Sequence, residues 1–332
     1  MNLLDMVMSR SNRMVAPLAG YPGVRLIGSS VREALNDAGV QLEALRELEE
    51  RLQPDIVFTL LDLTVEAESL GLGVDFFDKN PPSLVEQKLP KLERFYELGV
   101  PDPERASRMP LFLEVAEGLA ADGDRLCGAY VTGPFTLLAQ LLGTEELLER
   151  AKLGDPLTEP LGFATSVIGE YAAALASRVD IVVVVDPAAE ALKAKEFASL
   201  CRPYIGGLAG IIRSSGAICL IHICGDSTHL LEELALTGAE GMILDAKINL
   251  PREAEKIPSN LVLLGNIDPK RIIRRGTAED VRWEVRRLLR HMDKVRNFIL
   301  STGCDVPVEA PMRNLEAMME EARGWRPRGE MI

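Results

Sequence analysis

The stretch Ile181-Val182-Val183-Val184-Val185 decides the fold class, because all five of its residues are apolar and β-branched. A strand with one face in water alternates polar and apolar residues, whereas an unbroken apolar run is typical of a strand buried on both faces. Such strands belong to parallel sheets that are covered by helices. Seven further runs rich in Val, Ile and Leu are predicted to be strands, over residues 13–19, 55–61, 126–132, 217–223, 241–245, 261–265 and 297–302.

The segments between these runs carry many charges and show helical spacing, which predicts that strands and helices alternate along the chain. Residues 277–292 are an example, since Thr277 is placed to cap a helix in which Val281, Val285 and Leu288 share one face. Such helices are expected to cover the outside of the sheet. Eight strand–helix units in one chain favour a closed (β/α)8 TIM barrel, an α/β fold, over an open sheet.

We predict a single barrel domain over residues 1–332, because no low-complexity linker divides the sequence. The segment between the second and third predicted strands, 62–126, is too long for one crossover and contains NPPS at 80–83 and PDP at 101–103. We therefore expect 62–126 to hold a helical insertion over the barrel mouth. The first twelve residues are expected to form a short amphipathic lead-in helix.

Composition and charge exclude several classes of protein. No apolar run approaches the ~18 residues that a membrane span needs, which excludes a membrane protein. The chain has 37 Lys and Arg against 50 Asp and Glu, and its net charge of −13 disfavours nucleic acid as a partner. Its 5 cysteines, an odd number in 332 residues, do not make a disulfide framework. The start MNLLDMVMSRSNRMV lacks the pattern of a secretory signal, so a cytoplasmic location is expected.

The strongest candidate site is a metal centre. His222 and Cys224 are two residues apart at the end of the fifth predicted strand, so their side chains share a face. Cys304 directly follows the eighth predicted strand, and in a closed barrel the loops after these two strands converge over one axis. Nitrogen and sulfur donors of this kind bind zinc. A cysteine near a strand is more often a small buried residue. The three other cysteines are interpreted in that way: Cys127, Cys201 and Cys219.

Other polar residues at strand ends are candidates for binding substrate. Asp62 and Glu66 follow the second predicted strand, Asp186 follows the fourth, and Asn266 follows the seventh. A helix-capping role fits Asp186 and Asp268 equally well, because each precedes a proline.

Several motifs together resemble the uroporphyrinogen decarboxylase superfamily, and more specifically its corrinoid-dependent methyltransferase branch, which includes methylcobamide:coenzyme M methyltransferases. The resemblance spans nearly the whole chain. The motifs are His222-x-Cys224, Gly303-Cys304, Gly133-Pro134-Phe135-Thr136, Gly265-Asn266-Ile267-Asp268-Pro269 and Asp62-Leu63-Thr64-Val65-Glu66-Ala67-Glu68.

The resemblance implies a catalytic zinc held by His222, Cys224 and Cys304. Some members of the branch add a Glu at the end of the next strand, where this chain has Asp245, a shorter residue. We expect Asp245 to be a displaceable fourth zinc ligand or a close neighbour of the three ligands. True decarboxylases carry an arginine-rich motif near the N-terminus that grips substrate carboxylates. The corresponding stretch here is Ala16-Pro17-Leu18-Ala19-Gly20-Tyr21-Pro22-Gly23, in which Tyr21 is a candidate substrate-binding residue.

The function implied by the resemblance is methyl transfer between a small methylated substrate, such as a methoxy compound, and the cobalt of a corrinoid. The alternatives are a methylcobamide:thiol methyltransferase of the coenzyme M type, a uroporphyrinogen decarboxylase, and a non-catalytic zinc barrel that docks a corrinoid protein. The three histidines, His222, His229 and His291, do not form the D-x-H-x-x-G signature of a cobalamin-binding module. We therefore expect a separate corrinoid protein as partner, and we leave a homodimer open.

Overall fold

Parallel strands form a curled wall around a central axis in the computed structural model of this chain, which describes residues 2–85, 98–123, 125–154 and 156–326. The sheet order is β1-β4-β5-β6-β7-β8-β9, and every neighbouring pair is parallel. The strands are β1 (Ile56–Phe58), β4 (Leu126–Thr132), β5 (Ile181–Val185), β6 (Ile218–Ile223), β7 (Gly241–Leu244), β8 (Val262–Ile267) and β9 (Phe298–Thr302). These seven fall within, or overlap by most of their length, seven of the eight predicted runs.

The eighth position is filled by the segment around Val15, which closes the barrel between β9 and β1. Val15 forms a parallel bridge with Leu300, where Ala16 N donates to Leu300 O at 2.9 Å. On the other side, Asp55 N donates to Val15 O at 2.9 Å. The run at 13–19 is therefore reduced to a single bridge instead of the full strand that we expected. Pro17 explains this, because it has no N–H to continue the ladder.

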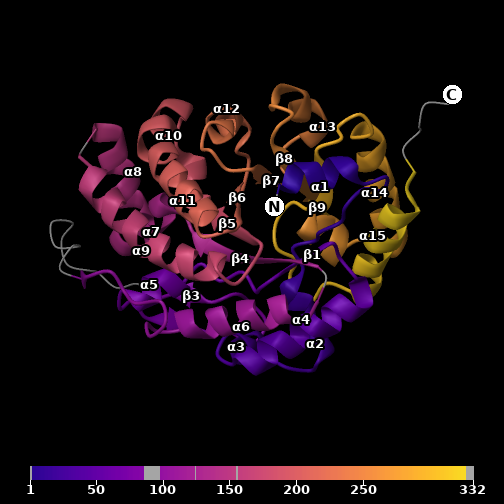
Figure 1. The fold of residues 1–332 in the computed structure, drawn as a ribbon, viewed down its shortest axis with the longest axis horizontal. Coiled ribbons are helices and arrows are strands. Elements are labelled where there is room, and N and C mark those ends of the chain that lie inside the picture. Colours follow the sequence, from indigo (N-terminus) through magenta and orange to yellow (C-terminus); the bar gives the residue numbers. More distant parts are fainter. Residues whose placement is uncertain (1, 86–97, 124, 155, 327–332) are drawn as a thin grey trace.

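Helices surround the strands on the outside (Figure 1). The longer ones are α4 (Ala38–Leu52), α6 (Met109–Ala121), α7 (Pro134–Leu142), α8 (Thr144–Leu153), α9 (Thr158–Ala176), α11 (Arg202–Ser214), α14 (Ala278–His291) and α15 (Met312–Gly324). The shorter ones are α1 (Leu3–Ser9), α2 (Gly20–Leu26), α3 (Val31–Ala34), α5 (Val65–Ser69), α10 (Ala194–Leu200), α12 (Leu231–Ala235) and α13 (Leu250–Glu253), with single turns η2 (Pro187–Ala191), η3 (Thr228–Leu230), η4 (Ala254–Lys256) and η5 (Pro269–Arg274).

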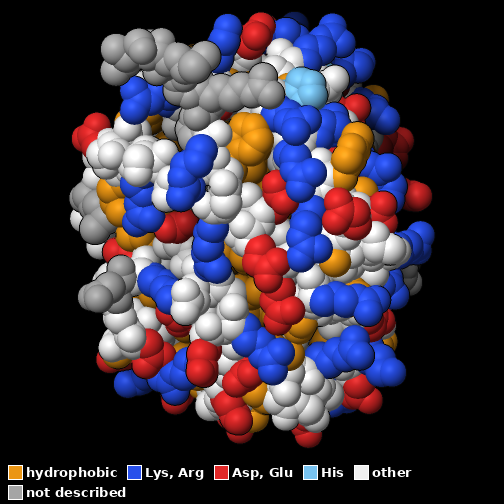
Figure 2. Space-filling model, turned by 90° about the vertical axis from the view of Figure 1, so that its right-hand side faces the viewer, with side chains coloured by type: hydrophobic (Ala, Val, Ile, Leu, Met, Phe, Trp, Pro, Cys, Tyr) orange, Lys and Arg blue, Asp and Glu red, His pale blue; other side chains and the backbone are white. Residues whose placement is uncertain are grey.

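The predicted helix over 277–292 is α14, and Thr277 caps it as expected. The Thr277 side chain accepts a hydrogen bond from Asp280 N at 3.2 Å, while Val281 and Val285 are buried. Figure 2 shows the side of the molecule that α14 and α15 help to form, where Lys, Arg, Asp and Glu side chains intermingle. Ion pairs link the two helices, among them Arg286 with Glu321 at 2.9 Å. In the described part of the chain, no helix combines the length and the apolar character that crossing a bilayer requires.

The inside of the barrel is a packed core rather than a channel. Inward-facing side chains such as Ile56, Val183 and Leu264 form one buried cluster. The predicted lead-in helix is α1, whose Leu3 and Val7 belong to the same cluster. Arg10, just after α1, pairs at 2.5 Å with Asp55, which precedes β1, and Met8 O accepts from Arg296, which precedes β9, at 3.0 Å. Helix α1 therefore covers the amino end of the strands and leaves the carboxyl end for the site.

The segment 62–126 is described only in part, since residues 86–97 lie outside the described residues. Its described portion contains α5, a small antiparallel hairpin of β2 (Val74–Asp75) and β3 (Ser83–Leu84), and α6. Helix α6 packs against α4, β4 and α9 as an outer-layer helix does. The hairpin belongs to the wall of a cavity described below.

Candidate metal centre

His222 lies at the carboxyl end of β6 with its ring buried. Its Nδ1 is 2.9 Å from Ile243 O on β7. Because a carbonyl oxygen can only accept, Nδ1 must carry the proton and donate, which leaves the lone pair on Nε2. The ring is therefore held in the tautomer and orientation that a metal ligand needs.

Two thiols converge on that free nitrogen. Cys224, which follows β6, has its Sγ 3.2 Å from His222 Nε2. Cys304, which follows β9, has its Sγ 3.8 Å from the Sγ of Cys224 although 80 residues separate the two along the chain. The ligand atoms of all three residues lie within 4.8 Å of one another. The structure thus places the three predicted ligands side by side at the carboxyl end of the barrel.

This donor set fits a zinc ion. Two sulfurs at about 2.3 Å from one ion, at a tetrahedral angle, are about 3.8 Å apart, and the two thiols have this separation of 3.8 Å. The 3.2 Å between Cys224 Sγ and His222 Nε2 is slightly shorter than the roughly 3.6 Å expected around zinc, so a small opening suffices. Among the described residues, no Asp or Glu oxygen joins this group.

Asp245 lies beside the group rather than in it. It follows β7, and its Oδ2 accepts a hydrogen bond from Gly225 N while its Oδ1 accepts from Lys247 N, both at 2.9 Å. Asn266, at the end of β8, donates from Nδ2 to Asp245 O at 2.9 Å. The structure therefore places Asp245 against the backbone that follows Cys224, and Asn266 against the backbone of Asp245.

A cavity of about 670 Å³ opens beside Cys304. Tyr21 and Asp62 contribute to its wall, as do residues 61–64 and the hairpin residues 79–84. Tyr21 is buried on α2 and its hydroxyl donates to Leu61 O at 2.7 Å. Two of the predicted substrate-binding residues, Tyr21 and Asp62, thus lie at the cavity.

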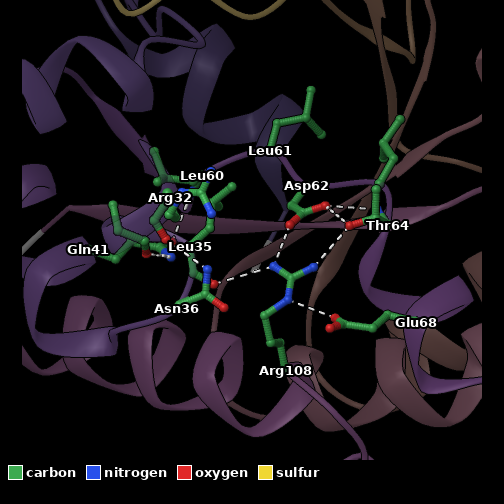
Figure 3. Close-up of polar contacts among 12 residues, drawn as sticks. Arg32, Leu35, Asn36, Gln41, Leu60, Leu61, Asp62, Thr64, Glu68 and Arg108 are labelled. Atoms are coloured by element: carbon green, nitrogen blue, oxygen red, sulfur yellow. Dashed lines mark hydrogen bonds and ion pairs between the residues drawn. The ribbon is translucent and has the colours of Figure 1, made fainter. Parts of the chain in front are cut away.

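Asp62 is also the centre of a buried ionic network, drawn in Figure 3. Its Oδ2 is 2.6 Å from Arg108 Nη1, and its Oδ1 accepts hydrogen bonds from the backbone N and the hydroxyl of Thr64 at 2.8 and 2.7 Å. Arg108 also pairs with Glu68 at 2.7 Å and stacks over the ring of Phe76. The carboxylate of Asp62 is therefore paired with Arg108 and held in one orientation. This suits a structural residue of the cavity wall better than a catalytic base.

Glu66 and Asp186 lie away from the cavity, and each bonds to the neighbouring strand–helix unit. Glu66 on α5 accepts hydrogen bonds from Thr132 N at 2.6 Å and the Thr132 hydroxyl at 2.9 Å. Asp186 accepts from Thr136 N at 2.8 Å at the start of α7. Burial raises the pKa of Glu66 to about 7 and that of Asp186 to about 6. Asp268 caps η5 by accepting from Lys270 N at 2.9 Å.

Sequence reasoning missed Asp305 and Arg108. Asp305 follows Cys304 and lines the cavity, and burial raises the pKa of its carboxyl well above the usual range. Its place directly after a predicted ligand was a usable signal. No sequence signal pointed to Arg108, because it reaches Asp62 from the start of α6, 46 residues away. The thiols predicted to be core residues, Cys127, Cys201 and Cys219, are all buried.

Comparison with known proteins agrees with this architecture. The family model described as uroporphyrinogen decarboxylase (URO-D) matches residues 14–325. The chain belongs to the uroporphyrinogen decarboxylase family. A solved structure of similar fold is a methyltransferase from Methanosarcina mazei, with a TM-score of 0.87, 21% identity and coverage of 96% of both chains.

Curated relatives of this uroporphyrinogen decarboxylase family member carry two kinds of name. Methylcobamide:CoM methyltransferase MtbA of Methanosarcina acetivorans is 27% identical over 274 residues, which are 80% of this chain and 78% of that protein. Methylcobamide:CoM methyltransferase MtaA of Methanosarcina barkeri is 25% identical over 77% of this chain and 76% of its own length. Uroporphyrinogen decarboxylase of Protochlamydia amoebophila is 28% identical over 83% of this chain and 77% of its own length.

Proposed function

We propose that this chain is a corrinoid-dependent methyltransferase that binds one zinc ion through His222, Cys224 and Cys304. The observation that carries the proposal is the convergence of these three ligand atoms within 4.8 Å at the carboxyl end of the barrel. Cys304 also lines the cavity of about 670 Å³, so a small molecule there would lie against the metal ligands. The names of the methyltransferase relatives support the same reaction class.

The chain's own residues would prepare this site for methyl transfer. His222 is held by Ile243 O with its Nε2 facing the thiol of Cys224, and the barrel core below it is apolar. Leu61, Pro82 and Val308 give part of the cavity wall an apolar surface that a methyl group could contact. When bound, zinc would supply Lewis-acid chemistry that keeps a thiol ionised or polarises a methyl ether. Three protein ligands leave a position for the substrate.

For the small substrate, we propose a methylated donor such as a methoxy compound, with the cobalt of a corrinoid protein as the methyl acceptor. The cavity wall combines apolar residues such as Leu61 and Val308 with charged ones such as Lys270, which suits a small organic molecule that has both apolar and polar parts. We also propose that residues 79–84, within the segment 62–126, cover part of the mouth, because they contribute to the cavity wall.

A second candidate is methyl transfer from a methylated corrinoid to a thiol. The observation that favours it is the shared name of the methyltransferase relatives, methylcobamide:CoM methyltransferase. The same three ligands serve both candidates, so the two differ in the direction of transfer and in the substrate.

Two other functions have less support. A decarboxylase of the family needs fixed cations for substrate carboxylates, yet Arg13 points its guanidinium at backbone carbonyls, with Nη2 2.7 Å from Met292 O. Neither Arg13 nor Arg25 lines the cavity beside Cys304. The cations that do line it are Lys79, Lys270 and Arg274, and none of them lies in the N-terminal stretch where the decarboxylases carry their arginine-rich motif. Arg274 also pairs with Glu309 at 3.5 Å. A purely structural zinc would be expected to have a fourth protein ligand, and the described residues bring only three together.

The test is a methyl-transfer assay with zinc-loaded protein. Methoxy compounds, methylamines and methylated thiols are offered with cob(I)alamin, and free thiols are offered with methylcobalamin. We expect transfer in one of the two directions, and its loss in Cys304→Ala with the fold retained. Failure of every substrate in both directions, with zinc bound, would contradict the proposal.

A further inference from the structure

The end of β7 lies against two of the three proposed ligands and supplies none itself. Ile243 O, on the strand, accepts the hydrogen bond of His222 Nδ1 at 2.9 Å. Just beyond the strand, Asp245 Oδ2 accepts the backbone N–H of Gly225 at 2.9 Å. Gly225 directly follows Cys224. Residues 243–245 therefore hold His222 through its ring and Cys224 through the amide of the next residue.

The carboxylate of Asp245 is held in one orientation. Its second oxygen, Oδ1, accepts the backbone N–H of Lys247 at 2.9 Å, and its backbone oxygen accepts from Asn266 Nδ2 at 2.9 Å. Asn266 Nδ2 also donates to Ile248 O at 2.8 Å, which fixes the turn that follows β7. With both carboxylate oxygens engaged by backbone amides, Asp245 stands outside the group of three ligand atoms.

The backbone that Asp245 holds has an unusual conformation. Gly225 has a φ of +99°, in the region that residues with a side chain rarely adopt. A Cβ at this position would lie 3.1 Å from Cγ of Glu190. The turn after Cys224 therefore depends on a glycine, and its amide needs a partner to hold the turn in place.

We propose that Asp245 is a positioning residue and not a metal ligand: by holding the Gly225 amide it aims the Cys224 thiol at the metal. This inference rests on the proposed function in so far as it assumes that zinc is bound. It leaves the fourth coordination position to the substrate. It also reverses what the family resemblance suggested, namely that Asp245 replaces a ligating Glu.

The zinc affinities of Asp245→Asn and Asp245→Glu distinguish a positioning residue from a metal ligand, because each role predicts that a different one of the two variants binds zinc more tightly. If Asp245 positions Cys224, Asp245→Asn keeps one carbonyl oxygen for the Gly225 amide, while its Nδ2 loses the hydrogen bond from Lys247 N, so this variant should lose less zinc affinity than Asp245→Glu. Asp245→Glu has a longer arm that misplaces this acceptor, so its zinc affinity should fall about 10- to 100-fold. If Asp245 ligates zinc, Glu should be tolerated and Asn should not.

The measurement is zinc competition against a chromophoric chelator, with circular dichroism to verify the fold. Asp268→Asn and Asp268→Glu are matched controls, since Asp268 also follows a strand but caps η5. Gly225→Ala should weaken zinc binding as well, since it disturbs the same turn.

Tight binding by the Glu variant together with a tenfold or greater loss in the Asn variant would overturn the inference, as would unchanged affinity in both. Should Asp245→Glu fail to fold, the Asn variant alone decides. Absence of zinc uptake by the wild type would overturn the metal site itself, which is a different and recognisable result.

Discussion

Cys224 and Cys304 differ from the other thiols of this chain in that they are only half-buried and meet at one point. We expect about one zinc per chain in the purified protein, with loss of zinc in Cys224→Ala and Cys304→Ala. Cys201→Ala should keep its zinc, because Cys201 is buried in the core. Metal analysis of the three variants tests this. Stoichiometric zinc in all of them would contradict the assignment.

Glu66 should make stability depend on pH. Burial raises the pKa of its carboxyl from an ordinary 4.5 to about 7, so between these values the folded chain binds more protons than the unfolded chain. The free energy of unfolding must then fall as pH rises through this window, by on the order of 3 kcal/mol from this group. Glu66→Gln should flatten the slope in urea unfolding between about pH 4.5 and 7.

The exposed Glu43 on α4 gives a matched control, since Glu43→Gln should retain the wild-type slope. An identical pH dependence in Glu66→Gln and the wild type would show that Glu66 is charged in the folded state at neutral pH.

The residues of the candidate metal centre could be chosen from the sequence because their chemistry is rare and strand ends converge in a barrel. The roles of Asp62, Glu66 and Asp186 could not be predicted from the sequence. A carboxylate after a strand can face the cavity or bond to the next strand–helix unit, as Glu66 does with Thr132. The choice depends on partners far away in the chain.

At the scale of elements, Arg108 joins the start of α6 to the loop after β1. Its guanidinium pairs with Asp62 at 2.6 Å and Glu68 at 2.7 Å. Arg108→Met should lower the free energy of unfolding by about 3–5 kcal/mol, because it leaves the carboxylate of Asp62 buried without its cation. Urea unfolding measures the loss.

The double variant Arg108→Met/Asp62→Asn checks the cause. It should lose less stability than the two single variants summed, because the stranded charge is gone. Additive losses would mean that Arg108 acts through packing alone, for example against Phe76.

The elements themselves were largely predictable, because strands buried on both faces have a plain signature. Val182 and Val184 pack outward against the helices, while Val183 and Val185 pack inward, so neither face tolerates polar residues. The run at 13–19 has the same apolar content, but Pro17 limits its pairing to one bridge. Hairpin β2–β3 was missed because strands of two residues carry no periodicity.

For the whole molecule, the proposed methyl transfer requires a corrinoid to reach the candidate metal ligands. In-line displacement demands that cobalt, methyl carbon and the attacking atom be nearly collinear at close range. We expect turnover to depend on an added corrinoid protein, with free cobalamin a poorer substitute, and zinc-ligand variants to bind the partner without turnover. Binding and rate measurements with purified components test this. Full activity with neither corrinoid protein nor cobalamin would refute the corrinoid reaction.

The closure of the barrel at Val15 and Leu300 has a consequence for how the chain is made. This contact joins positions about 285 residues apart, and it is completed only when β9 is available. While a ribosome is still producing the chain, the strands already formed have unpaired edges at both ends of the sheet. Such edges invite pairing with other chains. The nascent barrel is therefore open to such pairing until β9 has emerged, and it can close only after that step.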